Sequence, residues 1–564
     1  MMSAAADLLY STAPAHSNMA RHLYASALII VSLILALPLL AVISSFLIPA
    51  ADVWQHLLDT VLKEYILNSL ILMLGVASLT LLLGIIPAWL ITMCHFPLRR
   101  TLEWALLLPL AMPAYIIAYT YTGILDASGP VQLFIRELTG WQYGEYWFPE
   151  VRSIGGAITM LSFVLYPYIY LISRAAFIEQ SVCALEVART LGCGPYKTFF
   201  RVALPLSRPA IIVGLSLVLM ETLADYGTVQ YFGIATFTTG IFRTWFGLGS
   251  SAAAAQLSAL LMLFIVVLVY LEYWSRKQQR YHHTSNRYST LTRKKLQGKY
   301  AYSAFILCAL PVLLGFLIPV FSLIKWALLT YPKVINQQFL ILMWNSIMLA
   351  VCAAVIAVVL ALFMAYGKRR ISGPLTRVAV NLSGMGYAIP GTVIAVGVML
   401  PFAWLDKLID GFFRAYFDYS TGLLLSGTLV ALMFAYMARF LAVSLKTVDA
   451  GLAKIKPSMD EAGRSIGLNT YALIRKVHVP MMRGSLLTAV LLVFVDVLKE
   501  LPATLILRPF NFNTLAIRAY ELANEERLAD AACPSLAIVL VAIIPVIYLS
   551  RSISMSRPGH DYSA

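Results

Sequence analysis

The sequence is poor in charge, since only 12% of its 564 residues are Asp, Glu, Lys or Arg. Soluble domains carry about 25% charged residues. A chain of this length that is 60% hydrophobic cannot hide its apolar side chains in a water-soluble core. The six cysteines form no Cys-x-x-Cys pair, which argues against a disulfide framework or a zinc site. No Gly-Lys pair is followed by Ser or Thr, so the sequence also lacks a P-loop for nucleotide phosphates.

Long apolar runs recur along the whole chain instead. A run of about 20 apolar residues crosses a bilayer as a helix. We therefore predict an all-α polytopic membrane protein with twelve transmembrane helices, near 25–48, 67–93, 104–125, 154–177, 210–232, 252–274, 302–325, 345–367, 380–404, 422–445, 484–507 and 533–550.

The net charge of +15 fits a membrane protein whose basic residues gather in alternate loops. Cytoplasmic loops are enriched in Lys and Arg, so we read the excess as a topology signal and expect no nucleic-acid partner. This places both termini, 1–24 and 551–564, and the basic linker 275–300 in the cytoplasm. The first apolar run is too long for a signal-peptide core, and we expect it to be retained as a span.

The two halves of the chain, 25–274 and 301–550, are related by an internal repeat. Asn68 and Asn345 open equivalent spans 277 residues apart, and Pro113 and Pro390 keep the same displacement. Because each half has an even number of spans, both insert in the same orientation as parallel six-helix units. We expect a pseudo-two-fold axis along the membrane normal, with a pathway where the halves meet.

Two long cytoplasmic loops carry the most specific pattern. The first signature loop, 185–211, reads LEVARTLGCGPYKTFFRVALPLSRPAI, and the second, 460–486, reads DEAGRSIGLNTYALIRKVHVPMMRGSL. Each has Glu and Arg around small residues, a Gly six positions after the Glu, and a Pro thirteen positions after the Gly. The small residues predict a short helix that another protein can approach closely. Gly ends such a helix at positive φ, and Pro suits the first turn of the next helix.

Both loops resemble the EAA signature of ABC importer permeases, E-A-A-(x)3-G-(x)9-I-x-L-P. Val187 and Gly463 depart from its alanines. The resemblance implies a type I ABC importer permease fold, in which a coupling helix docks on a dimeric cytoplasmic ATP-binding subunit that holds ATP and Mg. The chain itself would then be no enzyme and would need no cofactor, metal site or catalytic residue of its own. The coupling residues implied are Glu186, Ala188, Arg189, Gly192, Pro205, Glu461, Ala462, Arg464, Gly467 and Pro480.

Ionisable residues inside two equivalent spans are the candidates for a translocation pathway, because charge within a membrane is costly and often functional. Carboxylate and phenolate oxygens are also the ligands that hard cations prefer. The alternative is structural, with an ion pair between Asp496 and Lys499 and the remaining acids bracing helix ends. The residues concerned are Glu221, Asp225, Tyr226, Asp496, Lys499 and Glu500.

The stretches ETLADYGT and KELPATLILRP in the same spans are similar to those of ferric iron permeases of iron(III) ABC importers. This resemblance implies a multi-pass protein of a bacterial inner membrane that works with a periplasmic ferric-binding protein. Permeases for thiamine, polyamines or phosphonates share the signature loop and stay open as alternatives. An ion-coupled secondary transporter is a less favoured one. The histidines, including His56, His95 and His478, are scattered and predict no active site.

Overall fold

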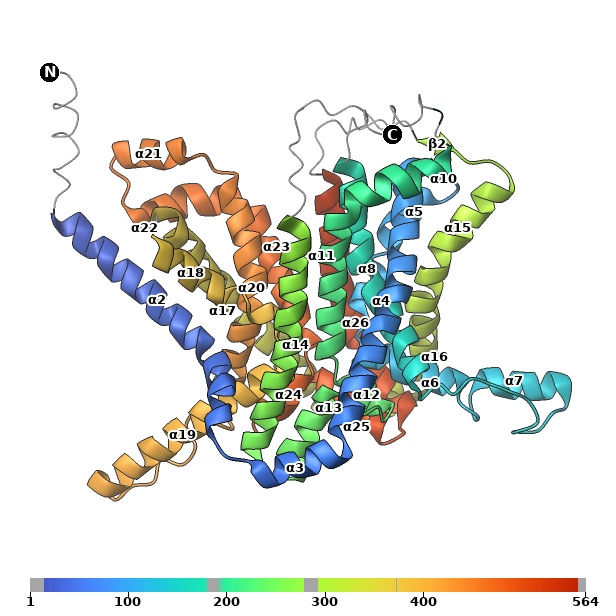
Figure 1. Ribbon diagram of the computed structural model, residues 1–564, viewed down its shortest axis with the longest axis horizontal. Coiled ribbons are helices and arrows are strands. Elements are labelled where there is room, and N and C mark those ends of the chain that lie inside the picture. Colours follow the sequence, from blue (N-terminus) through green and yellow to red (C-terminus); the bar gives the residue numbers. More distant parts are fainter. Residues whose placement is uncertain (1–14, 180–191, 193, 278–292, 372, 556–564) are drawn as a thin grey trace. The chain divides into compact units, whose positions relative to one another are not determined.

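The structure, a computed structural model, describes residues 15–179, 192, 194–277, 293–371 and 373–555 (Figure 1). Two compact units can be distinguished. Unit 1 comprises Met1–Ala41, Met348–Tyr387 and Gly397–Val497, and unit 2 comprises Val42–Ile347, Ala388–Val396 and Leu498–Ala564. The boundaries of these units differ from those of the sequence repeat, because the N-terminal helix packs in unit 1 with helices of the second half.

Helices joined by loops make up the described residues of unit 1. Its elements are α2 (Ala15–Ser44), α17 (Gln337–Arg370), α18 (Pro374–Ser383), η6 (Gly386–Ala388), α19 (Gly391–Phe417), α20 (Leu429–Ala453), α21 (Pro457–Ser465), α22 (Thr470–Leu473), η7 (Ile474–His478) and α23 (Val479–Leu498), of which α2, α17, η6, α19 and α23 extend into unit 2 at one end.

Unit 2 adds one two-stranded parallel pair to its helices. Its elements are η1 (Ser45–Leu47), α3 (Ala51–Thr60), α4 (Leu62–Met93), β1 (Cys94–His95), α5 (Arg99–Ala105), η2 (Leu108–Ala111), α6 (Ala114–Leu125), α7 (Pro130–Thr139), α8 (Ile154–Glu179), α10 (Pro195–Thr198), η3 (Phe199–Ala203), α11 (Leu204–Ala224), α12 (Gly227–Tyr231), α13 (Phe237–Phe242), η4 (Arg243–Gly247), α14 (Ser251–Lys277), β2 (Lys294–Lys295), α15 (Lys299–Val312), η5 (Leu313–Leu317), α16 (Ile318–Val334), α24 (Pro502–Leu507), α25 (Leu515–Asn524) and α26 (Leu528–Met555).

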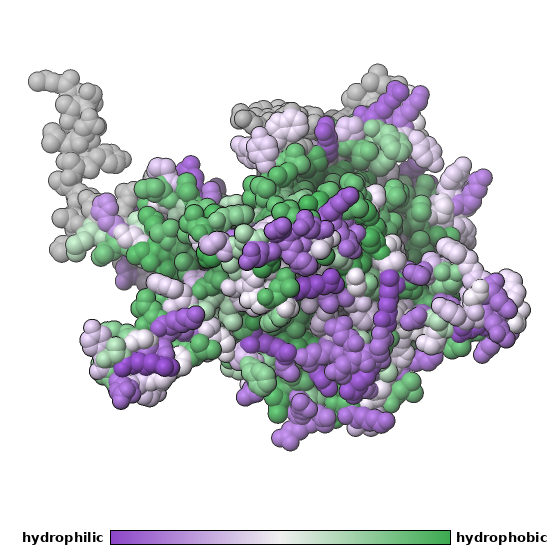
Figure 2. Space-filling model, turned by 60° about the horizontal axis from the view of Figure 1, so that its bottom comes forward, coloured by the Kyte–Doolittle hydropathy of each residue, from purple (hydrophilic) through white to green (hydrophobic). Residues whose placement is uncertain are grey.

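The predicted all-α membrane architecture is confirmed. The described residues contain 11 helices that are long and apolar enough to cross a membrane, or 12 if one bent pair counts as a span. Large apolar side chains are exposed along these helices, and Figure 2 shows hydrophobic residues over much of the visible surface. Such a surface requires lipid around it.

Four of the predicted spans differ from simple helices. The spans expected at 104–125 and 380–404 are interrupted before Pro113 and Pro390, and the first of these breaks bends the chain by 94°. Proline lacks an N–H and disfavours helical geometry in the residue before it. The spans expected at 210–232 and 484–507 end at Ala224 and Leu498, and each is followed by a short separate helix, α12 or α24.

The repeat is visible in equivalent hydrogen bonds within unit 2. Asn68 Nδ2 donates to the carbonyl of Ala235 at 2.9 Å, and Asn345 Nδ2 donates to the carbonyl of Asn513 at 3.4 Å. Each acceptor directly precedes the threonine that is the N-cap residue of α13 or α25. The asparagines that marked the repeat in the sequence therefore hold the same helix start in both copies.

Candidate functional site

The second signature loop forms a short helix, α21, as its small residues predicted. Glu461, Ala462 and Arg464 are exposed on it, whereas Gly463 is buried. A Cβ on Gly463 would lie only 2.5 Å from Leu473 Cδ1. The departure from alanine at this position of the signature thus lets α21 pack directly against α22, while its other face stays open to a partner.

Gly467 ends α21 in the way that the sequence predicted. Its φ is +84°, and its N–H bonds the carbonyl of Arg464 at 3.0 Å, while the N–H of Leu468 bonds the carbonyl of Gly463 at 3.0 Å. This pair of bonds is a Schellman motif, which satisfies the last carbonyls of the helix. Gly192 in the first signature loop has a φ of +78°, so both copies place a glycine in the left-handed region.

Three consecutive basic residues at the end of α17, here called the basic triplet, hold this loop in place. Lys368 Nζ pairs with Asp449 Oδ2 at 2.7 Å, and Arg370 donates to Thr470 Oγ1 at 2.8 Å. Arg369 donates to Asp460 Oδ2 at 2.9 Å and to the backbone carbonyls of α20 and the residues after it, at Leu452 and Ile455. The triplet therefore fixes both α21 and the end of α20.

Asp460 is the acidic centre of this anchor. Only 8% of it is exposed, and its second oxygen lies 2.8 Å from Nε2 of His478, which is fully buried. Two partners for one carboxylate offset the cost of burying it. The sequence did not indicate this His–carboxylate pair, because the two residues are 18 positions apart and meet only when α21 folds back on η7.

The first signature loop is only partly described. Glu186, Ala188 and Arg189 lie outside the described residues. Of the remaining predicted residues, Gly192 has no atom of a described residue within 4 Å of the place that a Cβ would take, and Pro205 lies at the start of α11.

The two prolines lie in the first turn of α11 and α23, as the sequence predicted, but both α-helices continue from a π-helical turn. Residues 196–224 and 470–498 are continuous helical segments, and each contains a π-helical turn, η3 or η7, that ends two residues before Pro205 or Pro480. A π-turn shifts the hydrogen-bond register by one residue, so a proline without an N–H can follow it inside a helix. The two π-turns are 275 residues apart, the displacement of the signature loops.

Asp225 and Glu500 cap the short helices that follow their spans. Asp225 accepts the N–H groups of Thr228 and Val229 at 3.1 Å, and Glu500 accepts those of Ala503 and Thr504 at 2.9 and 3.0 Å. Both carboxylates also accept from the threonine hydroxyl. Free N–H groups at a helix start are stabilised by such acceptors. This is the structural alternative that the sequence left open for these two acids.

The segments after the two acids meet within unit 2. A Cβ on Gly227 would lie 3.0 Å from Leu501 Cδ2, and the Tyr226 ring stacks on Phe242 with centroids 3.8 Å apart. The other predicted pathway residues, Glu221, Asp496 and Lys499, are partly buried at the ends of α11 and α23. Among the described residues, no group of three or more His, Cys, Asp or Glu side chains is arranged to hold a metal ion.

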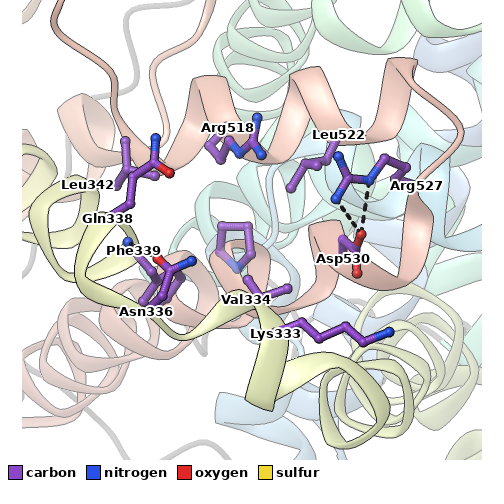
Figure 3. A pocket seen from close by; sticks show the side chains of 11 residues that line it. Lys333, Val334, Asn336, Gln338, Phe339, Leu342, Arg518, Leu522, Arg527 and Asp530 are labelled. Carbon is purple, nitrogen blue, oxygen red and sulfur yellow. Dashed lines mark hydrogen bonds and ion pairs between the residues drawn. The ribbon is translucent and has the colours of Figure 1, made fainter.

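A polar pocket lies where α16 and α17 meet α25 and α26 in unit 2 (Figure 3). Its volume is about 160 Å³, and its lining includes Lys333, Arg518 and Arg527. Asp530 pairs with Arg527 at 2.8 Å. Nearby, Arg152 pairs with Glu526 at 2.7 Å, and this hydrogen bond raises the pKa of Arg152. Basic side chains outnumber acidic ones in the pocket.

Comparison with known proteins gives two matches to one family model. The family described as binding-protein-dependent transport system inner membrane component matches residues 80–280 and 357–557. Both the starts and the ends of these segments are 277 residues apart, which is the displacement of Asn68 and Asn345.

Individual relatives differ in how much of the chain they cover. The Fe(3+)-transport system permease protein FbpB 2 of Haemophilus influenzae is 26% identical over 87% of this chain and 90% of its own length. The ferric transport system permease protein FbpB of Actinobacillus pleuropneumoniae is 22% identical over 78% of this chain and 64% of its own. The molybdenum transport system permease protein ModB of Escherichia coli is 31% identical, but over only 29% of this chain and 71% of its own.

Proposed function

Because the chain belongs to the family of binding-protein-dependent transport system inner membrane components, we propose that it is the translocating subunit of an ATP-driven importer of ferric iron. The ferric substrate is supported by similarity over nearly the full length to a relative named for Fe(3+) transport. The relative named for molybdenum transport covers less than a third of the chain.

The observation that carries the energy-coupling part of the proposal is α21. Its exposed Glu461, Ala462 and Arg464 stand on a helix that the basic triplet ties to α17. A docking surface that transmits force must be rigidly joined to the helices it moves, and this anchor supplies that joint. We assign ATP and Mg to a dimeric cytoplasmic partner subunit that docks on both signature loops.

In this mechanism a periplasmic ferric-binding protein delivers the cargo to outer loops, including 126–153, 405–421 and 508–532. Closure of the ATPase dimer draws the coupling helices together and opens the pathway outward, and hydrolysis resets it. Both termini are cytoplasmic in this orientation. Arg152, Glu526 and the pocket of Figure 3 lie in or beside these loops.

The test of coupling is uptake of labelled ferric iron by cells in which a variant replaces the wild-type chain. Gly192→Asp combined with Gly467→Asp should abolish uptake while membrane insertion persists. Gly140→Asp is the matched control, because Gly140 also has a positive φ and open space around it but lies in an outer loop. Normal uptake by the double variant would refute the coupling role.

The test of the solute runs on cells that lack the chain. Uptake of ferric iron, molybdate, sulfate, thiamine and putrescine is measured in parallel. A deficit in iron alone supports the ferric assignment. A deficit in another solute with normal iron uptake would keep the transporter class and discard the cargo.

A further inference from the structure

A second cavity lies at the start of α5 in unit 2, beside β2 and the first turn of α15. Its volume is about 690 Å³, and it is open to solvent. Arg100 and Lys295 line it from two separate segments, and His95 of β1 also contributes to its lining. None of the described residues that line this cavity is acidic.

The strand pair and a turn at Leu98 place the basic residues of this cavity. The parallel pair of β1 and β2 places Lys295 beside His95, and the N–H of Leu296 bonds the carbonyl of His95 at 3.0 Å. Leu98 adopts a φ of +54°, which costs a non-glycine residue about 1–2 kcal/mol. After this turn Arg99 is buried, where it bonds the carbonyl of Ile91 and pairs with Glu103, while Arg100 remains exposed.

The neighbouring surface is apolar. Leu98 is 62% exposed, and Tyr302 and Ile306 of α15 are 69% and 57% exposed. Tyr302 and Ile306 are four positions apart, so they lie on one face of the helix. The cavity therefore places a pair of cations beside an apolar helix face. An anionic phospholipid carries the complementary groups, a negatively charged phosphate and apolar acyl chains.

We propose that this cavity binds the headgroup of an anionic phospholipid. Arg100 and Lys295 contact its phosphate, and its acyl chains follow Tyr302 and Ile306 along α15. Basic pockets beside transmembrane helices attract anionic headgroups, and each Lys or Arg near the membrane surface contributes about 1 kcal/mol. The inference rests on the membrane location of the proposed transporter and is independent of its solute.

The test is native mass spectrometry of the delipidated full-length chain with added phosphatidylglycerol. Arg100→Ala combined with Lys295→Ala should weaken binding of this lipid about tenfold or more, and Arg100→Gln or Lys295→Gln alone about fivefold. The control pair is Arg377→Ala with Lys446→Ala, which removes one exposed Arg and one exposed Lys from unit 1. It should leave the affinity within about twofold.

Binding of phosphatidylcholine and of inorganic phosphate is measured in the same way, to distinguish a lipid headgroup from free phosphate as the bound anion. Weak binding of both, with tight binding of phosphatidylglycerol, supports a lipid site. The proposal would be overturned if the two lipids bound equally well, or if the cavity variants and the control variants had the same affinity for phosphatidylglycerol. Full competition by millimolar phosphate would also overturn it. A failed iron-uptake experiment would leave this result unaffected, because no step of it measures transport.

Discussion

Nε of Arg369 donates to Oδ2 of Asp460 at 2.9 Å, and the two residues are 91 positions apart. This contact joins the end of a predicted span to the start of the signature helix. Because the guanidinium also binds the carbonyls of Leu452 and Ile455, one side chain connects three segments of unit 1. The position of α21 therefore depends on a residue outside the signature loop.

Arg369→Ala should uncouple transport without blocking insertion. Asp460 is largely buried, and without the guanidinium its carboxylate keeps only His478 of the two partners described above. Breaking a buried ion pair in this way lowers the stability of the protein by about 3 kcal/mol. We expect iron uptake to fall about tenfold or more. Lys446→Ala, at an exposed lysine of α20, is the control. Uptake by Arg369→Ala within about twofold of wild type would contradict the anchoring role.

Gly463→Ala should destabilise the chain although alanine is the residue of the signature. Its Cβ would press on Leu473 Cδ1, and overpacking of this kind costs about 1–3 kcal/mol. The measurement is the thermal transition of the purified protein. Leu473→Val shortens the opposing side chain, so the penalty of Gly463→Ala should be smaller in that background.

The control for this cycle is Gly484→Ala. Gly484 lies within α23, and among the described residues no atom lies within 4 Å of the place that its Cβ would take. Alanine in a helix interior is favoured over glycine by about 0.5–1 kcal/mol, so this variant should not lower the transition. Equal penalties for Gly463→Ala in both Leu473 backgrounds would show that the close contact is not the cause.

Asp225→Ala should lower stability by about 1–2 kcal/mol, because it removes the cap of α12. Asp225→Asn keeps an acceptor oxygen, and we expect it to retain both most of the stability and iron uptake. The pair Glu500→Ala and Glu500→Gln should rank in the same order at α24. Loss of uptake in the amide variants, with an unchanged thermal transition, would instead support a pathway role for the charge.

The sequence predicts the membrane architecture and the repeat well, because spans are defined by long apolar runs and the repeat by fixed displacements. It also predicts the helix and glycine turn of the second signature loop. It missed the basic triplet, whose three adjacent cations at the end of α17 read as an ordinary positive loop. It also missed the contact of Asp460 with His478. Both depend on how segments far apart in the chain fold together, which apolar periodicity does not specify.

Breaks in helices were the other failure. Pro113 and Pro390 mark the repeat in the sequence, and the residues around them are apolar enough to predict uninterrupted spans. The π-turns before Pro205 and Pro480 leave no sequence signal beyond the proline itself. Hydropathy indicates which residues prefer lipid, but it does not predict the hydrogen-bond register inside a helix.

Asp406→Ala should open the segment 418–427. Asp406 is 1% exposed, and it accepts the N–H groups of Leu424, Leu425 and Ser426 at 3.1, 2.9 and 2.7 Å. Without the carboxylate these donors lose their partner at a cost of about 1–3 kcal/mol. Hydrogen exchange of these three amides should then accelerate by about 10- to 100-fold.

Asp418→Asn is the control for this experiment, because Asp418 is an exposed aspartate of the same loop and Asn tolerates its φ of +48°. It should leave the protection of the three amides unchanged. If the binding protein docks on 405–421, Asp406→Ala should also weaken that docking, measured with the purified partner, since a disordered loop must be ordered on binding. Unchanged exchange in Asp406→Ala would show that other contacts hold the loop closed. Faster exchange with unchanged docking would show that the docking surface lies outside 405–421.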